Sequence, residues 1–172
     1  TLLWAAFNAI RQTDLKALLA YSTISQLGLI MSLFGVGSLA YATDIKISTV
    51  LLVQASFAAL FHLMNHATFK GALFMVIGII DFQIGTRDLR RLGGLIAFMP
   101  ISFTVALIGS FSMAGLPPFN GFLSKEMFFS AMLHLRELDL FSSEALATLF
   151  PIIAWIASIF TFVYSMMIVF ET

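Results

Sequence analysis

The chain has 172 residues, of which 60% are hydrophobic and only 10% are charged, and its nine basic residues are balanced by nine acidic ones. A soluble domain carries about 25% charged residues, because charge must cover its surface. The composition therefore excludes a soluble enzyme, a nucleic-acid-binding protein and a disordered tail. It predicts an all-α, polytopic bundle of transmembrane helices, in which backbone groups are hydrogen-bonded internally. The absence of cysteine excludes disulfides, thiolate metal sites and cysteine nucleophiles.

Three apolar stretches separated by short polar links form the first half of the chain. Residues 1–10 are too few to cross ~30 Å of hydrocarbon, which takes about 20 residues, so we expect the end of a truncated helix. This apolar start, without a basic leader, indicates a piece of a longer membrane protein. Residues 15–40 and 47–80 are each long enough to be a transmembrane helix. The stretch 47–80 would reach roughly 50 Å, so we expect it to tilt, kink or extend beyond the bilayer core.

The next apolar stretch, residues 95–135, is interrupted by Pro117 and Pro118. Two consecutive prolines remove two backbone donors and push the preceding residues out of the α-helical region. This segment is therefore expected to be a discontinuous transmembrane helix, with two half-helices separated by non-helical backbone near residues 114–120.

The last apolar stretch, 149–170, is expected to be a transmembrane helix, and the polar stretch 134–147 before it is compatible with a short surface helix. If each stretch crosses once, the links at 11–16 and 87–91 share one side and hold five Lys or Arg residues. The links at 41–46 and 134–147 share the other side and hold two. The positive-inside rule therefore places the first pair in the cytoplasm.

Three ionisable residues lie in the middle of the 47–80 stretch with helical spacing. His62, His66 and Lys70 follow one another every four residues, so a helix would place them on one face over ~12 Å. Each ionisable group inside a membrane span costs roughly 2.5–3.5 kcal/mol on insertion scales. Because histidine can accept and donate protons, and lysine in a site of low dielectric can release and retake one, the pattern favours an interior proton or ion relay. Helix–helix hydrogen bonding, with Lys70 reaching an interface, is the alternative.

Two further charged sites are candidates. Lys125 and Glu126 follow the proline break, where exposed carbonyls beside them could form an ion or proton site, or where both could be solvated at the membrane surface. Lys16, near Asp14 at the start of a span, is expected to be an interfacial anchor, with membership of the relay as the alternative. The sequence contains no recognisable phosphate loop, metal-ligand set or cofactor site, so we expect neither cofactor nor metal. No catalytic site is recognisable, so the chain is not expected to be a redox enzyme by itself.

Three segments carry a family resemblance. They are TDLKALLAYSTISQLG at 13–28, FHLMNHATFKGALF at 61–74 and SMAGLPPFNGFLSKE at 112–126. In this order they resemble the proton-translocating subunits shared by respiratory complex I and Mrp-type cation/proton antiporters. The segments GTRDLRRLGG at 85–94 and NGFLSKE at 120–126 resemble the A-type subunits of Mrp antiporters most closely. The antiporter-like subunit of complex I (NADH:quinone oxidoreductase) is the close alternative.

The resemblance implies two inverted five-helix repeats, each with one discontinuous helix, of which this chain would be most of the second. It implies a membrane subunit of a multi-subunit Na⁺ (monovalent cation)/H⁺ antiporter in the bacterial plasma membrane. The implied partners are the other subunits, the lipid bilayer, protons and monovalent cations. Six residues match positions to which the family assigns proton passage: Lys16 and Lys70 on a central hydrophilic axis, His62 and His66 as bridging groups, and Lys125 with the adjoining Glu126 on the broken helix.

Overall fold

A computed structural model of the protein describes residues 1–42, 46–134 and 144–172. Seven α-helices and one short 3₁₀ helix lie in this part of the chain. They are α1 (Leu2–Ile10), α2 (Leu15–Ala42), α3 (Lys46–Ile84), η1 (Leu89–Arg91), α4 (Leu95–Phe98), α5 (Pro100–Ala114), α6 (Asn120–His134) and α7 (Glu144–Phe170).

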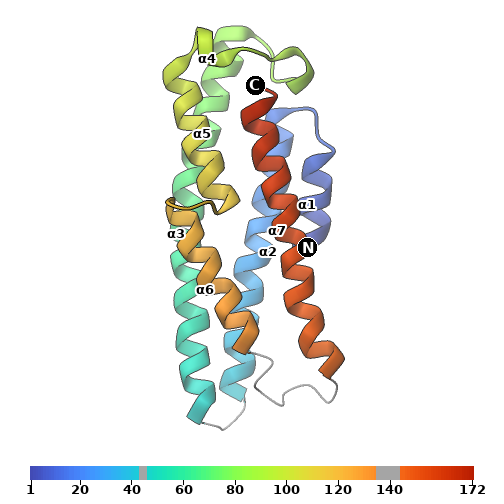
Figure 1. Ribbon diagram of the computed structural model, residues 1–172, viewed down its shortest axis with the longest axis vertical. Coiled ribbons are helices and arrows are strands. Elements are labelled where there is room, and N and C mark those ends of the chain that lie inside the picture. The colour runs from blue at the N-terminus through green and yellow to red at the C-terminus, as the bar shows by residue number, and fades with distance from the viewer. Residues whose placement is uncertain (43–45, 135–143) are drawn as a thin grey trace.

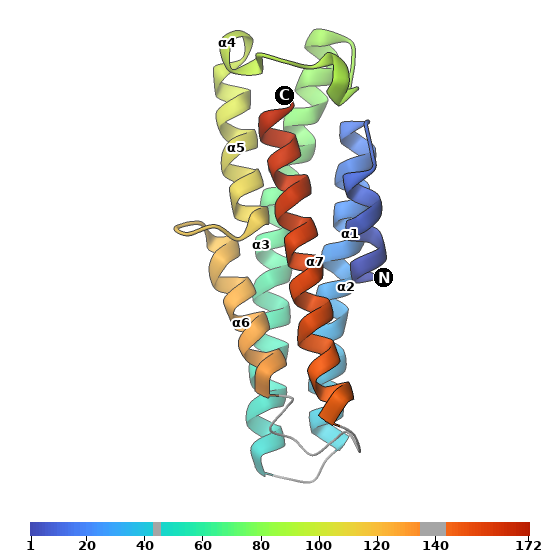
Figure 2. The same ribbon diagram turned by 45° about the vertical axis from the view of Figure 1, so that its right-hand side comes forward.

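The long helices form an elongated bundle (Figure 1). α2, α3 and α7 run along the long axis, and α5 and α6 lie end to end in one column beside α3, as the rotated view also shows (Figure 2). Three described helical segments are long and apolar enough to cross a membrane: Leu15–Ser38, Leu52–Ile84 and Thr148–Phe170. The expected all-α transmembrane bundle is thereby confirmed.

The break between α5 and α6 confirms the expected discontinuous helix. α5 ends at Ala114, and Gly115 adopts a left-handed conformation with φ +79°, which a glycine tolerates best. Its amide donates to the carbonyls of Phe111 and Ser112, so two carbonyls at the helix end are satisfied. α6 begins at Asn120, after the two prolines.

A second interruption was not expected from the sequence. Within the stretch 95–135, the short helix α4 ends at Phe98, and Met99 leaves the helical region with φ −139° and ψ 63°. Pro100 then occupies the first turn of α5. The cause is the same as at the first break, because a residue that precedes proline disfavours the α conformation. The short surface helix considered for 134–147 falls largely outside the described residues.

One end of the bundle holds the links before α2 and after α3. The amide of Leu15 donates to the carbonyl of Arg87 (3.1 Å), and the amide of Leu89 donates to the carbonyl of Thr13 (2.9 Å). Arg87 Nε lies 3.4 Å from Asp14 Oδ2. These bonds hold the two links together. We call the end of the bundle that carries them the loop end. At the start of η1, the hydrogen bond from the Arg90 guanidinium lowers the pKa of Asp88, the residue that caps this helix.

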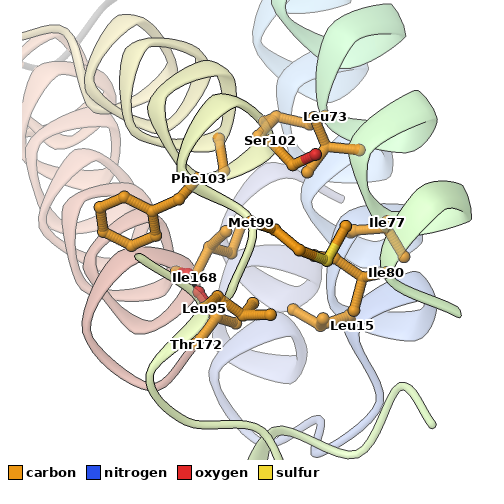
Figure 3. Close-up of a pocket in the computed structure, with 12 residues that line it drawn as sticks. Leu15, Leu73, Ile77, Ile80, Leu95, Met99, Ser102, Phe103, Ile168 and Thr172 are labelled. Carbon is orange, nitrogen blue, oxygen red and sulfur yellow. Dashed lines mark hydrogen bonds between the residues drawn. The ribbon is translucent and has the colours of Figure 1, made fainter. Parts of the chain in front are cut away.

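Two apolar clusters pack the interior of the bundle. The loop-end cluster includes Leu15, Leu18, Leu19, Leu73, Ile77, Met113 and Ile168. The far cluster includes Leu29, Leu33, Ala55, Ala59, Phe128, Ala131 and Ala154. A small pocket in the loop-end cluster is lined mainly by apolar side chains, with Met99 reaching toward Leu15 and Ile80 (Figure 3). Because this pocket is apolar, we assign it to core packing.

Candidate proton-relay site

A layer of buried polar residues separates the two apolar clusters. On α2 the buried polar residues lie between Leu19 and Leu29, and on α3 they lie between Ala59 and Leu73. We call this region the polar layer. Its buried members are Ser22, Ser25, Gln26, His62, Asn65, His66, Lys70, Ser110, Ser112, Ser124, Lys125, Thr161 and Ser165.

The three ionisable residues of α3 lie inside the bundle. His62, His66 and Lys70 are only 1%, 5% and 4% exposed, so the expected interior face is observed. The opposite face of α3 is apolar and exposed, and includes Met64 and Met75. The helix therefore presents charge-bearing groups inward and hydrocarbon outward, as the cost of ionisable groups in lipid requires.

Both ring nitrogens of His62 have hydrogen-bond partners. Nδ1 lies 2.9 Å from the hydroxyl of Ser124 on α6, and Nε2 lies 2.9 Å from Oε1 of Gln26 on α2. His62 thus connects α3 to α6 through one ring nitrogen and to α2 through the other.

Gln26 continues this network to α7. Its amide nitrogen donates to Tyr164 Oη at 3.1 Å and faces Thr161 Oγ1 at 3.4 Å. The Tyr164 hydroxyl in turn donates to Thr161 Oγ1 (3.2 Å). Four helices, α2, α3, α6 and α7, therefore meet at one hydrogen-bonded cluster around His62.

Lys70 and His66 lie closer to the loop end than His62. Lys70 Nζ donates to the carbonyl of Leu19 (3.2 Å) and to the hydroxyl of Ser22, both on α2. His66 Nε2 is buried without a hydrogen-bond partner among the described residues. A buried ring nitrogen without a hydrogen-bond partner is costly, so its presence here needs an explanation.

Lys125 lies at the break between the half-helices. It is 7% exposed, and its Nζ donates to the carbonyl of Ala114 (2.8 Å), the last residue of α5. Nearby, Asn120 donates to Asn65 Oδ1 (3.0 Å) and ties the start of α6 to α3. The alternative that Lys125 is a solvated surface residue does not fit its burial within the described chain.

Glu126 differs from its neighbour. It is exposed and, with Lys125, Ser130 and Trp155, lines a groove between α6 and α7. Adjacent residues on a helix point in different directions, so Glu126 reaches the exposed part of this groove, whereas the Lys125 amine turns to the Ala114 carbonyl at the helix break.

Lys16 lies at the loop end, where an interfacial anchor was expected. Its side chain is 44% exposed, and Nζ is 3.5 Å from Asp81 Oδ2. The Lys70 partners Leu19 and Ser22 follow it by three and six residues on α2. Lys16 therefore lies one to two helical turns along α2 from the groups that accept hydrogen bonds from Lys70.

Four network residues were missed as candidates: Gln26, Ser124, Thr161 and Tyr164. The spacing of Thr161, Tyr164 and Ser165 in the last apolar stretch was a usable signal, since it places polar groups on one helical face. As for metals, no group of three His, Asp or Glu side chains comes together as a bound ion would need, within the described ranges.

Comparison with known proteins identifies the family. The family model described as NADH:quinone oxidoreductase/Mrp antiporter, TM matches residues 1–150. The A subunits of the Na⁺/H⁺ antiporters of Bacillus subtilis and Alkalihalophilus pseudofirmus are 58% and 57% identical over all 172 residues. The chain spans 21% of the length of each.

A solved structure agrees with these relatives. In the Mrp complex from a Dietzia species, one chain superposes on 98% of this chain with a TM-score of 0.79 and 38% identity, and 16% of that chain is covered. The match of sequence and fold covers nearly the whole bundle, including the polar layer. The chain therefore belongs to the NADH:quinone oxidoreductase/Mrp antiporter transmembrane family.

Proposed function

We propose that this chain is part of the A-type component of a multi-subunit Na⁺/H⁺ antiporter in the plasma membrane of a bacterium, where it carries protons through the membrane. The observation that carries the proposal is the burial of His62, His66, Lys70 and Lys125 in one polar layer. The names of the relatives favour an antiporter over a component of complex I.

The proposed route follows the polar layer from the loop end. Lys16, beside Asp81, exchanges protons with the aqueous side, and Lys70 receives them one to two turns deeper. His66, with its free nitrogen, and then His62 continue the route along α3. Lys125 at the helix break, with Glu126 beside it, passes the proton toward the groove between α6 and α7. Water molecules bridge the steps that are not directly hydrogen-bonded.

Lysine-to-arginine variants test this proposal. A carrier must exist in charged and neutral forms, and lysine can do so whereas arginine stays protonated in proteins. In the full-length antiporter, Lys70→Arg and Lys125→Arg should lose most Na⁺-driven proton flux in membrane vesicles while protein levels on blots stay normal. Near-normal flux would show that these lysines only hold a charge in place. Arg91→Lys, on the exposed part of η1, is the matched control and should retain flux.

The orientation in the membrane is also open to test. We propose that the loop end faces the cytoplasm, because its links carry most of the basic residues. With native cysteines removed from the full-length protein, Gly93→Cys should react with an impermeant maleimide only in inside-out vesicles. Ser142→Cys, in the polar sequence stretch 134–147, should react only in right-side-out vesicles. The reverse pattern would invert the orientation.

A further inference from the structure

The Ser124 hydroxyl has two possible acceptors and one proton. Ser124 is fully buried, and its Oγ lies 2.9 Å from His62 Nδ1 and 3.1 Å from the carbonyl oxygen of Gly121. A hydroxyl can donate to only one of these two acceptors at a time. Which acceptor it uses depends on whether Nδ1 carries a proton.

The other ring nitrogen of His62 determines where the imidazole titrates. Nε2 faces Oε1 of Gln26, and a carbonyl oxygen only accepts hydrogen bonds. The amide is held in this orientation because its nitrogen donates to Tyr164 Oη. Nε2 therefore carries a proton in both charge states, and Nδ1 is the atom that gains and loses one.

Two fully hydrogen-bonded states follow. When His62 is neutral, Nδ1 accepts from the Ser124 hydroxyl. When His62 is charged, Nδ1–H donates to Ser124 Oγ, and the hydroxyl turns to the carbonyl of Gly121. One proton is gained at Nδ1, the Ser124 O–H bond stays intact, and no heavy atom has to move.

We propose that Ser124 is a positioning residue of the proton relay, whose hydroxyl turns between His62 Nδ1 and the Gly121 carbonyl each time His62 loses or gains a proton. This inference rests on the proposed function, since it concerns the same route. It adds a group on α6, adjacent to Lys125, that keeps both charge states of His62 hydrogen-bonded.

Removal of the hydroxyl should act on the charged state above all. In Ser124→Ala the Nδ1–H of the imidazolium has no acceptor, and a buried donor without a partner is costly. The other titratable groups near His62 are His66 on α3, Lys125 on α6 and, through Gln26, Tyr164 on α7. None of them is hydrogen-bonded to Nδ1 in the described chain, so none replaces Ser124 directly.

The experiment compares Na⁺-driven proton flux against pH for full-length antiporters in vesicles, normalised to protein level. Ser124→Ala should lower flux about tenfold. The part of the flux–pH curve that reports protonation of His62 should also move about one pH unit lower. Ser124→Thr, which keeps a hydroxyl, should restore flux and the pH profile. Ser124→Cys, of similar size but with weaker hydrogen bonds, should fall between alanine and serine. Ser32→Ala removes a half-buried hydroxyl that donates to the Leu29 carbonyl within α2, outside the polar layer, and should leave the profile unchanged.

Two results would overturn the inference. One is normal flux and an unchanged pH profile in Ser124→Ala. If Lys70→Arg still abolishes flux in the same assay, only this inference fails, and the proposed function stands. The other is a loss in Ser124→Ala without a pH shift and without any rescue by threonine or cysteine, which would mark a packing role. If Lys70→Arg and Lys125→Arg themselves retain flux, the proposed function fails, and this inference fails with it.

Discussion

Gln26 shows how a single uncharged side chain organises the polar layer. It is 1% exposed, accepts from His62 through Oε1 and donates to Tyr164 through Nε2. Both ends of the amide are thus used, and each partner belongs to a different helix. A buried amide with satisfied ends adds little net stability, whereas its loss leaves the partners unsatisfied.

Substitution of Gln26 should therefore destabilise the protein more than its own burial suggests. Gln26→Leu is expected to cost about 1–3 kcal/mol, because the His62 and Tyr164 groups lose partners in a buried site. The purified complex in detergent should show a lower Tm. Thr23→Val is the control, since the Thr23 hydroxyl bonds to the carbonyl of Leu19 in its own helix. Equal effects from the two substitutions would contradict a special role for the amide.

At the scale of the element, the junction of α5 and α6 depends on the close approach of two backbones. A Cβ atom on Gly121 would overlap the carbonyl oxygen of Ser112, which is backbone and cannot swing aside. The missing side chain lets α6 start against the end of α5 and keeps Lys125 within reach of the Ala114 carbonyl.

Gly121→Ala should accordingly disrupt the junction. We expect a loss of more than about 3 kcal/mol, seen as a strongly reduced protein level and Tm, because overpacking against backbone cannot relax by a rotamer change. Gly78→Ala on α3 is the matched control. A Cβ there meets open space, so this variant should be neutral or up to about 1 kcal/mol more stable through helix propensity. Similar behaviour of the two variants would refute the close approach.

The whole molecule places its polar layer near the middle of its longest helix. His66 is 20 residues from the start of α3 at Lys46 and 18 from its end at Ile84. At ~1.5 Å per residue α3 is about 58 Å long, so both ends extend beyond a ~30 Å bilayer core. The ionisable groups therefore lie in the part of α3 that is farthest from both of its ends, as the proposed proton route requires.

The sequence predicted the features that depend on one segment alone. Apolar length predicted the spans, paired prolines predicted the break after Ala114, and the four-residue spacing predicted that His62 and Lys70 share an inward face. The interruption at Met99 has a proline signal too, at Pro100, but a single proline inside a long apolar stretch is a weaker signal than the pair at 117 and 118.

Contacts between helices could not be predicted in this way. Periodicity shows which face of a helix is polar, but it does not show which neighbour meets that face. The pairing of His62 with Ser124, and of Gln26 with Tyr164, depends on the packing of four helices. The exposure of Glu126 beside the buried Lys125 likewise depends on the position of α7 across the groove.

The last prediction concerns the polar layer as one unit. Within the described residues, the buried lysines and histidines all lie in this single layer, so protons should pass Lys70 and Lys125 in series. In a serial route one blocked step limits the total flux. Residues that act as a unit therefore give strongly non-additive losses, whereas independent sites give losses that multiply.

Single and double alanine variants separate these cases. Lys70→Ala and Lys125→Ala should each lower Na⁺-driven proton flux per antiporter, and the double variant should lie within about twofold of the more impaired single one. Initial rates in vesicles, corrected for protein level, give the comparison. Lys70→Ala combined with Ser32→Ala, outside the polar layer, provides the reference for a pair in which only one member carries protons. If the fraction of flux kept by the double lysine variant equals the product of the fractions kept by the two single variants, the lysines contribute independently, and the single relay is wrong.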